Sequence, residues 1–152
     1  MLCLREYQPA DFERLLEIDL TCFAEGIAYS AAELHHFLSL PSAFTIIGED
    51  EGDIQGFIVA DHYRPRGAKR YVGKIITIDV LADARRSGLG SKLLQAAEKK
   101  LVAADCGYVS LEAAVDNLPA LGFYKKHGYS ALRILPRYYM GSLDALLMGK
   151  RL

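Results

Sequence analysis

The 152-residue sequence has no tryptophan, only three cysteines and no long apolar run. Cys3, Cys22 and Cys106 are odd in number and far apart, which argues against a disulfide framework and against a Cys-x-x-Cys motif. We expect reduced, buried thiols in a cytoplasmic protein. The early charged residues do not fit a signal peptide, and no stretch has the length of a membrane-spanning helix, so no contact with a membrane is expected.

A strong net charge is missing as well. The 18 lysines and arginines nearly balance the 19 acidic residues, and a net charge of −1 does not suit a nucleic-acid-binding protein. The four histidines lack the spacing of metal ligands, so we predict no metal site. With 51% hydrophobic and 24% charged residues, the composition is typical of one globular domain over residues 1–152. We expect a monomer or a weak dimer.

The most informative segment is Lys74–Leu101. Apolar and polar residues alternate over Ile76–Val80, which predicts a strand. Over Leu89–Leu101 apolar residues recur every three or four positions, which predicts a helix. The turn between them, Arg85–Gly90, contains two glycines and opens directly into the helix. Free amides and the positive end of the helix dipole converge in such a turn, so we interpret it as a diphosphate site.

Other nucleotide motifs fit this turn less well. A P-loop needs a Gly-Lys-Ser/Thr ending, and a dinucleotide fold needs a third glycine where Leu93 stands. A tight turn without any ligand is the remaining alternative. The segment resembles Arg/Gln-x-x-Gly-x-Gly/Ala, the coenzyme A pyrophosphate loop of GNAT-family acetyltransferases, with Arg85, Gly88 and Gly90 at the fixed positions. The resemblance implies acetyl-CoA as co-substrate, in contact with Ile78, Asp79, Val80, Arg85, Arg86, Ser87, Gly88, Leu89, Gly90, Ser91 and Asn117.

The predicted order of elements agrees with this family. It is strand, two helices, three strands, helix, strand, helix and two strands. The expected strands are 2–7, 43–49, 54–63, 74–80, 108–114, 129–135 and 144–150, with helices starting near residues 11, 30, 89 and 117. The first helix has an apolar face that includes Leu15, Ile18 and Leu20, and segment 21–29 is expected to be irregular. Ser30 with Glu33 predicts a capping box, Asn117 predicts a helix cap, and Gly128 predicts the end of that helix. We therefore expect a single α/β GNAT domain, with a mixed, mostly antiparallel sheet of about seven strands flanked by about four helices.

Glu112 and Tyr124 are the candidate catalytic residues. Acetyl transfer to an amine needs a base for the ammonium and an acid for the leaving thiolate. A carboxyl group in an apolar strand is desolvated, which improves it as a base, and a phenol suits the acid. With Asn117, the two residues resemble the Leu-Glu-x-x-x-x-Asn and Tyr-x-x-x-Gly-Phe/Tyr pattern of RimI-type N-terminal acetyltransferases, in which the glutamate is the base. Asp79 is the alternative base; a solvent-facing glutamate and a core tyrosine are the structural alternatives.

The C-terminal segment 137–148 resembles the Arg-x-Tyr-Tyr…Asp-Ala…Met segment of N-terminal protein acetyltransferases. The resemblance implies that Tyr138 and Tyr139 line a peptide groove and that Phe23 and Tyr29 belong to its facing wall. It also implies that the acceptor is the α-amino group of a protein or peptide, as in the ribosomal-protein acetyltransferases.

Two departures from the family pattern concern the acceptor side. Ala82 stands where the family usually has proline, and Ala114 stands where the RimI group commonly has arginine. A small-molecule amine acetyltransferase and a non-catalytic acyl-CoA-binding module therefore stay open as alternatives. The presence of both Glu112 and Tyr124 favours an enzyme, and no acidic cluster of the kind expected for an aminoglycoside pocket is seen.

Overall fold

The computed structural model describes residues 1–152 and contains seven strands and four α-helices, as the sequence predicts. In chain order they are β1 (Leu2–Glu6), α1 (Phe12–Cys22), α2 (Ala31–Leu38), β2 (Phe44–Asp50), β3 (Asp53–Tyr63), β4 (Tyr71–Val80), α3 (Leu89–Ala103), β5 (Cys106–Ala114), α4 (Leu118–Lys126), β6 (Ser130–Tyr139) and β7 (Leu143–Arg151). Two short 3₁₀ helices, η1 (Pro9–Asp11) and η2 (Ala82–Ser87), precede α1 and α3.

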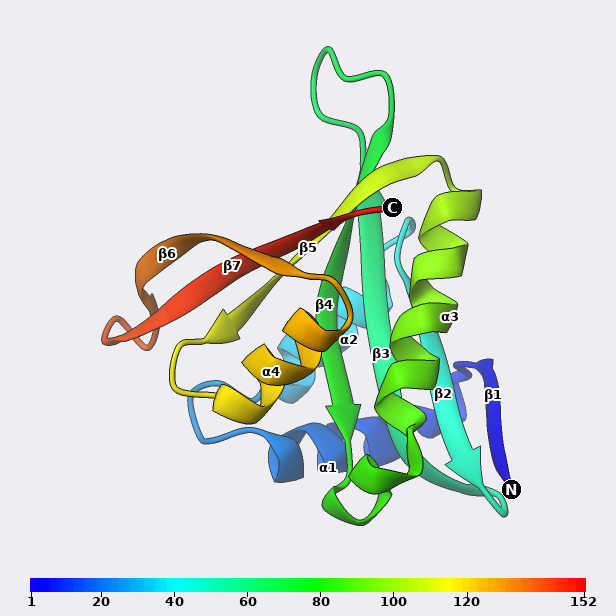
Figure 1. Cartoon of the computed structure of the whole chain (residues 1–152). Coiled ribbons are helices and arrows are strands. Elements are labelled where there is room, and N and C mark those ends of the chain that lie inside the picture. The colour runs from blue at the N-terminus through cyan, green and yellow to red at the C-terminus, as the bar shows by residue number, and fades with distance from the viewer.

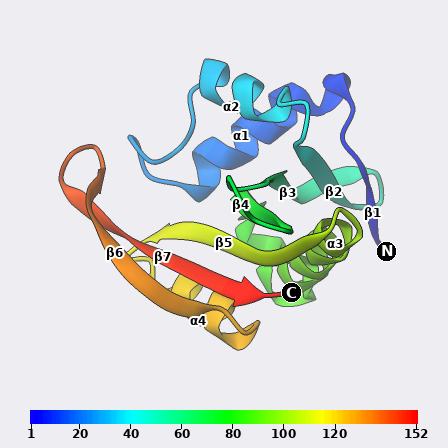
Figure 2. The ribbon, with the colours of Figure 1, turned by 90° about the horizontal axis from the view of Figure 1, so that it is seen from above.

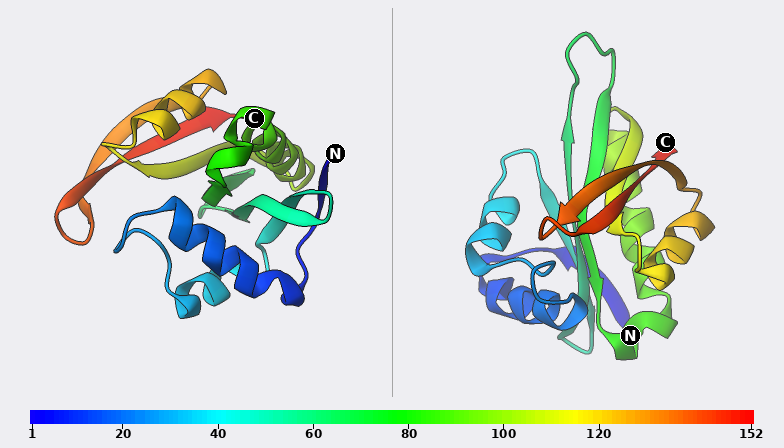
Figure 3. Two further views of the ribbon diagram at one scale, coloured as in Figure 1. Left: turned by 90° about the horizontal axis from the view of Figure 1, so that it is seen from below. Right: turned by 90° about the vertical axis from the view of Figure 1, so that its left-hand side faces the viewer.

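The strands form one mixed sheet in the order β1-β2-β3-β4-β5-β7-β6, in which only the β4–β5 pair is parallel. Helices α1 and α2 cover one face of the sheet and α3 and α4 cover the other (Figures 1 and 2). The two helix layers stand on either side of the sheet in the right-hand view of Figure 3. None of the helices is long and apolar enough to cross a bilayer.

Each face of the sheet has its own core. The stripe predicted for α3 is fully buried and joins a cluster of 17 buried residues that also includes Tyr124 of α4. A smaller cluster of seven lies under α1 and α2. In α1, Leu15 and Ile18 are fully buried, whereas Leu20, which was also expected on the apolar face, is 60% exposed. The sheet therefore separates two chemical environments, and the side on which a strand residue points decides its neighbours.

The local start signals of two helices work as the sequence predicts. Ser30 and Glu33 form a capping box at the start of α2, with hydrogen bonds of 3.1 Å and 3.0 Å between each side chain and the other residue's amide. Asn117 caps α4 by accepting a hydrogen bond from the amide of Ala120 at 3.3 Å. Gly128, with a φ of +92°, ends that helix.

The β4–β5 pair is the irregular part of the sheet. The two strands pair only where Tyr71–Lys74 lies beside Cys106–Ser110. Beyond this point β5 continues along β7, while Ile75–Val80 remains paired with β3 alone. A register shift in the β3–β4 ladder leaves Ile76 without a direct partner between Ile75 and Thr77. The shift changes which residues point to which face, so Ile75 belongs to the larger core under α3, whereas Thr77, which bonds Asp79, lies on the α1 side.

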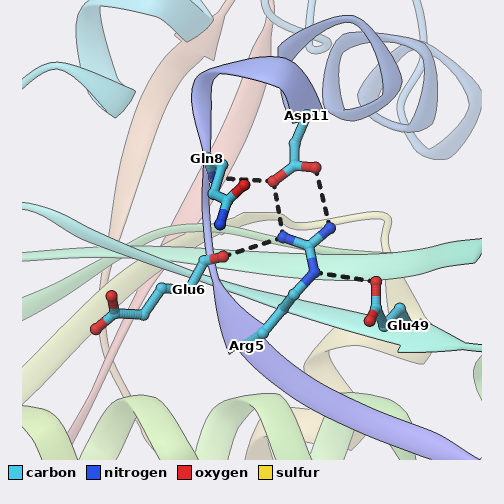
Figure 4. Close-up of polar contacts among 5 residues, drawn as sticks. All are labelled: Arg5, Glu6, Gln8, Asp11 and Glu49. Atoms are coloured by element: carbon cyan, nitrogen blue, oxygen red, sulfur yellow. Dashed lines mark hydrogen bonds and ion pairs between the residues drawn. The ribbon is translucent and has the colours of Figure 1, made fainter. Parts of the chain in front are cut away.

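Far from this irregularity, a charged cluster fastens the first strand to the first helix (Figure 4). Arg5 contacts both carboxylate oxygens of Asp11, at 2.9 Å and 3.0 Å, and donates to Glu49 on β2 at 3.0 Å. The amide of Gln8 donates to the same Asp11 at 2.8 Å. The Arg5 guanidinium lowers the pKa of Asp11 below its ordinary value.

Four sequence-based details are wrong. Cys3 is exposed and not buried, because it lies on the edge strand β1. The irregular segment predicted from Thr21 begins only after Cys22, since α1 continues to that residue. β4 begins at Tyr71, three residues earlier than predicted, because its first residues pair with β5. β6 includes 136–139, predicted as a connection, because Tyr139 still pairs with Leu143.

Candidate active site

The glycine turn before α3 presents backbone amides in the predicted way. Gly88 has a φ of +82°, a left-handed conformation that favours glycine, and it caps α3. The first helical hydrogen bond runs from the amide of Lys92 to the carbonyl of Gly88 at 3.1 Å. The amides of Leu89, Gly90 and Ser91 therefore have no partner within the helix, and they lie at the positive end of its dipole. This is the geometry that binds a diphosphate.

Side chains around the turn fix its position. The Leu89 side chain is fully buried against Gly48, so only its backbone is available to a ligand. Arg85 donates through Nε to the carbonyl oxygen of Val80 at 3.0 Å. Ser91 contacts Nε2 of His127, at the end of α4, at 2.9 Å. The contact with His127, which the sequence analysis missed, ties α4 to the first turn of α3.

The end of β4 points its residues alternately toward the two faces. Ile78 and Val80 pack against the larger core, on the side of α3 and α4. Asp79 lies opposite Phe57, a member of the smaller core, and is fully buried. Burial and the neighbouring carboxyl of Asp19 raise the pKa of Asp79 well above its ordinary value, partly offset by a hydrogen bond from Thr77. A carboxyl group that keeps its proton makes a poor base.

Glu112 stands on β5, next to the point where β4 departs. Its neighbours in the strand, Leu111 and Ala113, belong to the larger core, so Glu112 points to the opposite face, that of α1 and α2. Its side chain is 17% exposed and its Oε1 lies 3.1 Å from Nζ of Lys74. The sequence predicted a carboxyl group among apolar neighbours; the structure adds a lysine on the adjacent strand. No sequence pattern links these two positions, because they meet only through β4–β5 pairing.

Tyr124 approaches the same region from the other face. The residue is buried, with 8% of its surface exposed, and belongs to the larger core. Burial raises its pKa first, and electrostatic interactions with Asp79 and Tyr139 raise it further, so the phenol keeps its proton at neutral pH. The hydroxyl of neighbouring Tyr129 donates to Glu98 at 2.8 Å. Tyr124 thus combines the expected core packing with a protonated hydroxyl group close to β4.

The two segments predicted to line the acceptor site meet in the structure. Gly26, in the α1–α2 loop, packs so closely against the side chain of Met140, in the β6–β7 turn, that a side-chain atom added at Gly26 would clash with it. Tyr29 donates through its hydroxyl to the carbonyl of Ile76 at 3.3 Å, which places it against β4. Tyr138 and Tyr139 pack edge to face with ring centroids 5.0 Å apart. The contact between Gly26 and Met140 was not predicted.

Burial and neighbouring ionisable groups raise the pKa values of the tyrosines around Glu112. Burial and then Tyr138 and Glu112 raise the pKa of Tyr139 to about 12. Burial raises the pKa of Tyr29, with further contributions from the carboxyl groups of α1 and β4 and from both tyrosines of β6. The structure therefore brings Glu112, Tyr124, Tyr29 and Tyr139 into one neighbourhood. Phe23 lies at the start of the same loop, as the C-cap of α1.

Comparisons with known proteins indicate the family to which this fold belongs. Residues 12–129 match the acetyltransferase (GNAT) family. An N-alpha-acetyltransferase of Sulfurisphaera tokodaii is 29% identical over 155 residues, covering 96% of this chain and 90% of the relative. The crystal structure of Ard1 from Thermoplasma volcanium superimposes with a TM-score of 0.88 at 29% identity, covering 99% and 97% of the two chains.

The chain belongs to the GNAT family and is an acetyl-CoA-dependent N-acetyltransferase, as its sequence predicts. The resemblance to the RimI group is matched by the ribosomal-protein-S18-alanine N-acetyltransferase of Escherichia coli. That structure superimposes with a TM-score of 0.83 over 99% of this chain and 94% of the other, and its 19% identity establishes a common fold.

Proposed function

We propose that this enzyme transfers the acetyl group of acetyl-CoA to the α-amino group of a protein or peptide N-terminus. The observation that carries the proposal is the position of Glu112 and Tyr124, on opposite faces of the sheet where β4 and β5 separate. The acceptor loops meet on the Glu112 side. The similarity to an N-alpha-acetyltransferase supports the same acceptor class.

In the proposed reaction the diphosphate of acetyl-CoA binds to the free amides of Leu89, Gly90 and Ser91, with Arg85 or Arg86 nearby. Asn117, at the start of α4, is a further contact, compatible with its role as a cap. The acetyl-bearing arm lies along the backbone of Ile78–Val80, which has no neighbour on the β5 side. Acetyl-CoA is thus held by main-chain groups on one side of the site, and the acceptor amine enters from the other side.

The two proton transfers are assigned to Glu112 and Tyr124, which lie on opposite faces of the sheet. Glu112 takes a proton from the incoming ammonium group, and the freed amine attacks the carbonyl carbon of the thioester. A carbon–nitrogen bond forms and the carbon–sulfur bond breaks, and the nitrogen releases its second proton to solvent as the amide forms. Tyr124 gives its proton to the departing thiolate and regains one from solvent. Because base and acid approach from opposite faces, the amine can enter on one side while the thiolate leaves on the other.

An α-amine suits this site better than a lysine side chain. Its pKa lies near 8, against about 10.4 for lysine, so a carboxylate can deprotonate it at neutral pH. Tyr138 and Tyr139 offer phenol groups, which can bond the peptide backbone whatever the side chains are. The expectation of reduced thiols fits a cytoplasmic location, where N-termini of new proteins would be available.

A peptide screen tests the acceptor class. Matched peptides with a free N-terminus, with a blocked N-terminus and an internal lysine, and a small control amine are incubated with acetyl-CoA and analysed by mass. We expect one acetyl group, on the free N-terminus only. Acetylation confined to lysine or to the small amine would overturn the proposal. Binding of acetyl-CoA without transfer to any acceptor would instead support a binding module.

A further inference from the structure

Two carboxyl groups, Asp19 on α1 and Asp79 on β4, are neighbours in the interior. Asp19 and Asp79 are both fully buried, with 0% of their surfaces exposed. Each has one oxygen with a donor: the amide of Tyr29 donates to Asp19 Oδ2 at 2.7 Å, and the Thr77 hydroxyl donates to Asp79 Oδ1 at 2.5 Å. The other oxygen of each, Asp19 Oδ1 and Asp79 Oδ2, is buried without a donor.

Two charged carboxylates in this arrangement would carry a large cost. Each unpaired oxygen would be desolvated, and the like charges would repel one another at short range. Both problems disappear if one proton lies between the two unpaired oxygens, because the pair then carries a single charge and all four oxygens have a partner. We propose that Asp79 stays protonated and donates a hydrogen bond to Asp19. This shared proton holds the α1–α2 loop against β4.

The surrounding groups do not supply another partner for either oxygen. From α1, the Cys22 thiol donates to the carbonyl of Val80 at 3.5 Å. From η2, Arg85 donates to that same carbonyl and so is engaged by the backbone. From the loop, the Tyr29 hydroxyl donates to Ile76, and from α4 the neighbouring titratable group is Tyr124. Burial raises the pKa of Cys22, Tyr29 and Tyr124, so all three are neutral at pH 7.

Asp19 connects the two carboxyl groups to segment 23–29, which lines the acceptor side of the site. Its side chain accepts from the amide of Tyr29, and its carbonyl accepts from the amide of Phe23 at 3.1 Å. Asp19 therefore holds both ends of segment 23–29, which contacts Met140 across the site. It is a positioning residue for the acceptor side. This consequence rests on the proposed function, whereas the shared proton does not.

Asparagine at position 19 is the sharpest test. In Asp19→Asn the amide oxygen can still accept from Tyr29, and the amide nitrogen can donate to an ionised Asp79 in place of the shared proton. In Asp19→Ala both contacts are lost. Glu17→Gln, an exposed change on the same helix, is the matched control. Infrared spectra, unfolding curves and steady-state kinetics are collected for all four proteins between pH 6 and pH 10.

We expect wild type and Glu17→Gln to show the carbonyl band of a protonated carboxyl at neutral pH, and Asp19→Asn to lack it. If wild type lacks the band while folded at pH 7, the shared proton is refuted, whatever the acceptor. For peptide acetylation, Asp19→Ala should raise KM about tenfold with kcat little changed, and Asp19→Asn should restore KM to within about threefold of wild type. As pH rises, the ratio of the wild-type KM to that of Asp19→Asn should increase. Titration of the peptide affects both KM values equally, so it cancels in this ratio.

The outcomes separate the two parts of the proposal. A band without any effect of Asp19→Ala on peptide KM would confirm the proton and refute the positioning role. Equal losses in Asp19→Ala and Asp19→Asn, in folded proteins, would refute the proposed exchange of a proton for an amide. If no peptide is acetylated at all, the proposed function fails, and the infrared comparison still decides the proton.

Discussion

The acetyl-CoA side of the proposed site is built from main-chain groups in one continuous segment, whereas the acceptor side is built from side chains of three segments. Segment 82–91 forms its turn through the left-handed Gly88 and the start of α3. The acceptor side needs the α1–α2 loop, the β6–β7 turn and Glu112 on β5 to come together. The first can be assembled locally; the second depends on the whole fold.

This difference has a functional consequence. Main-chain amides bind a diphosphate irrespective of most side chains, so the same glycine turn can serve many family members. Side chains on the acceptor loops can change without disturbing that turn. Substitutions on the acetyl-CoA side should therefore affect every reaction of the enzyme, while those on the acceptor side should alter peptide use alone.

The largest effect is expected on the acetyl-CoA side. Gly90→Glu places a carboxylate among the amides that would hold the diphosphate, so acetyl-CoA binding should fall below calorimetric detection. Gly122→Glu adds the same charge at an exposed, open position of α4 and serves as the control. Loss of binding in both variants would mean that added charge in general, and not this turn, weakens binding. Normal binding by Gly90→Glu would mean that the turn before α3 does not bind the diphosphate.

Next in size is the loss of the acid. Tyr124→Phe removes the proton donor and should lower kcat by roughly 10²-fold, with acetyl-CoA affinity almost unchanged. Tyr129→Phe removes a hydroxyl that bonds Glu98, and it should reduce stability more than kcat. If the two variants lose kcat equally, Tyr124 acts through packing.

A smaller, selective effect is expected for Tyr139→Ala. Loss of a groove wall should raise the KM for peptide about tenfold and leave the KM for acetyl-CoA nearly unchanged. Tyr63→Ala changes an exposed tyrosine at the end of β3 and should alter neither constant. A parallel rise in both KM values for Tyr139→Ala would break the proposed division between the two sides.

The smallest effect concerns a carboxyl group outside both sides. The pKa of Asp11 is lowered in the folded protein, so its contribution to stability is present above about pH 4 and is lost as pH falls. Asp11→Asn should lower the free energy of unfolding by about 1 kcal/mol at pH 7 and by less in acid, with kinetics unchanged.

The contribution of Asp79 to stability depends on pH in the opposite direction. Its raised pKa stabilises the fold at low pH, and that contribution is lost as pH rises. Unfolding curves between pH 3 and pH 9 measure both slopes.

The sequence predicted the elements whose signals are local. The α3 stripe, the capping box at Ser30 and the glycine turn each depend on residues a few positions apart. The contact between Lys74 and Glu112 could not be predicted, because it depends on where β4 leaves β5. Asp19 gave one signal that was missed: it stands among Leu15, Ile18 and Cys22 at helical spacing, on a face otherwise made for burial.

The pH dependence of Glu112→Gln tests most directly whether Glu112 deprotonates an N-terminal ammonium group. Single-turnover rates of wild type and Glu112→Gln are measured with a free-N-terminus peptide from pH 6 to pH 10. At neutral pH we expect a deficit of roughly 10²-fold in the variant. Above the peptide's pKa near 8 the amine arrives already deprotonated, so the deficit should shrink steadily. A deficit that is the same at every pH, or no deficit at pH 7, would contradict the role assigned to Glu112.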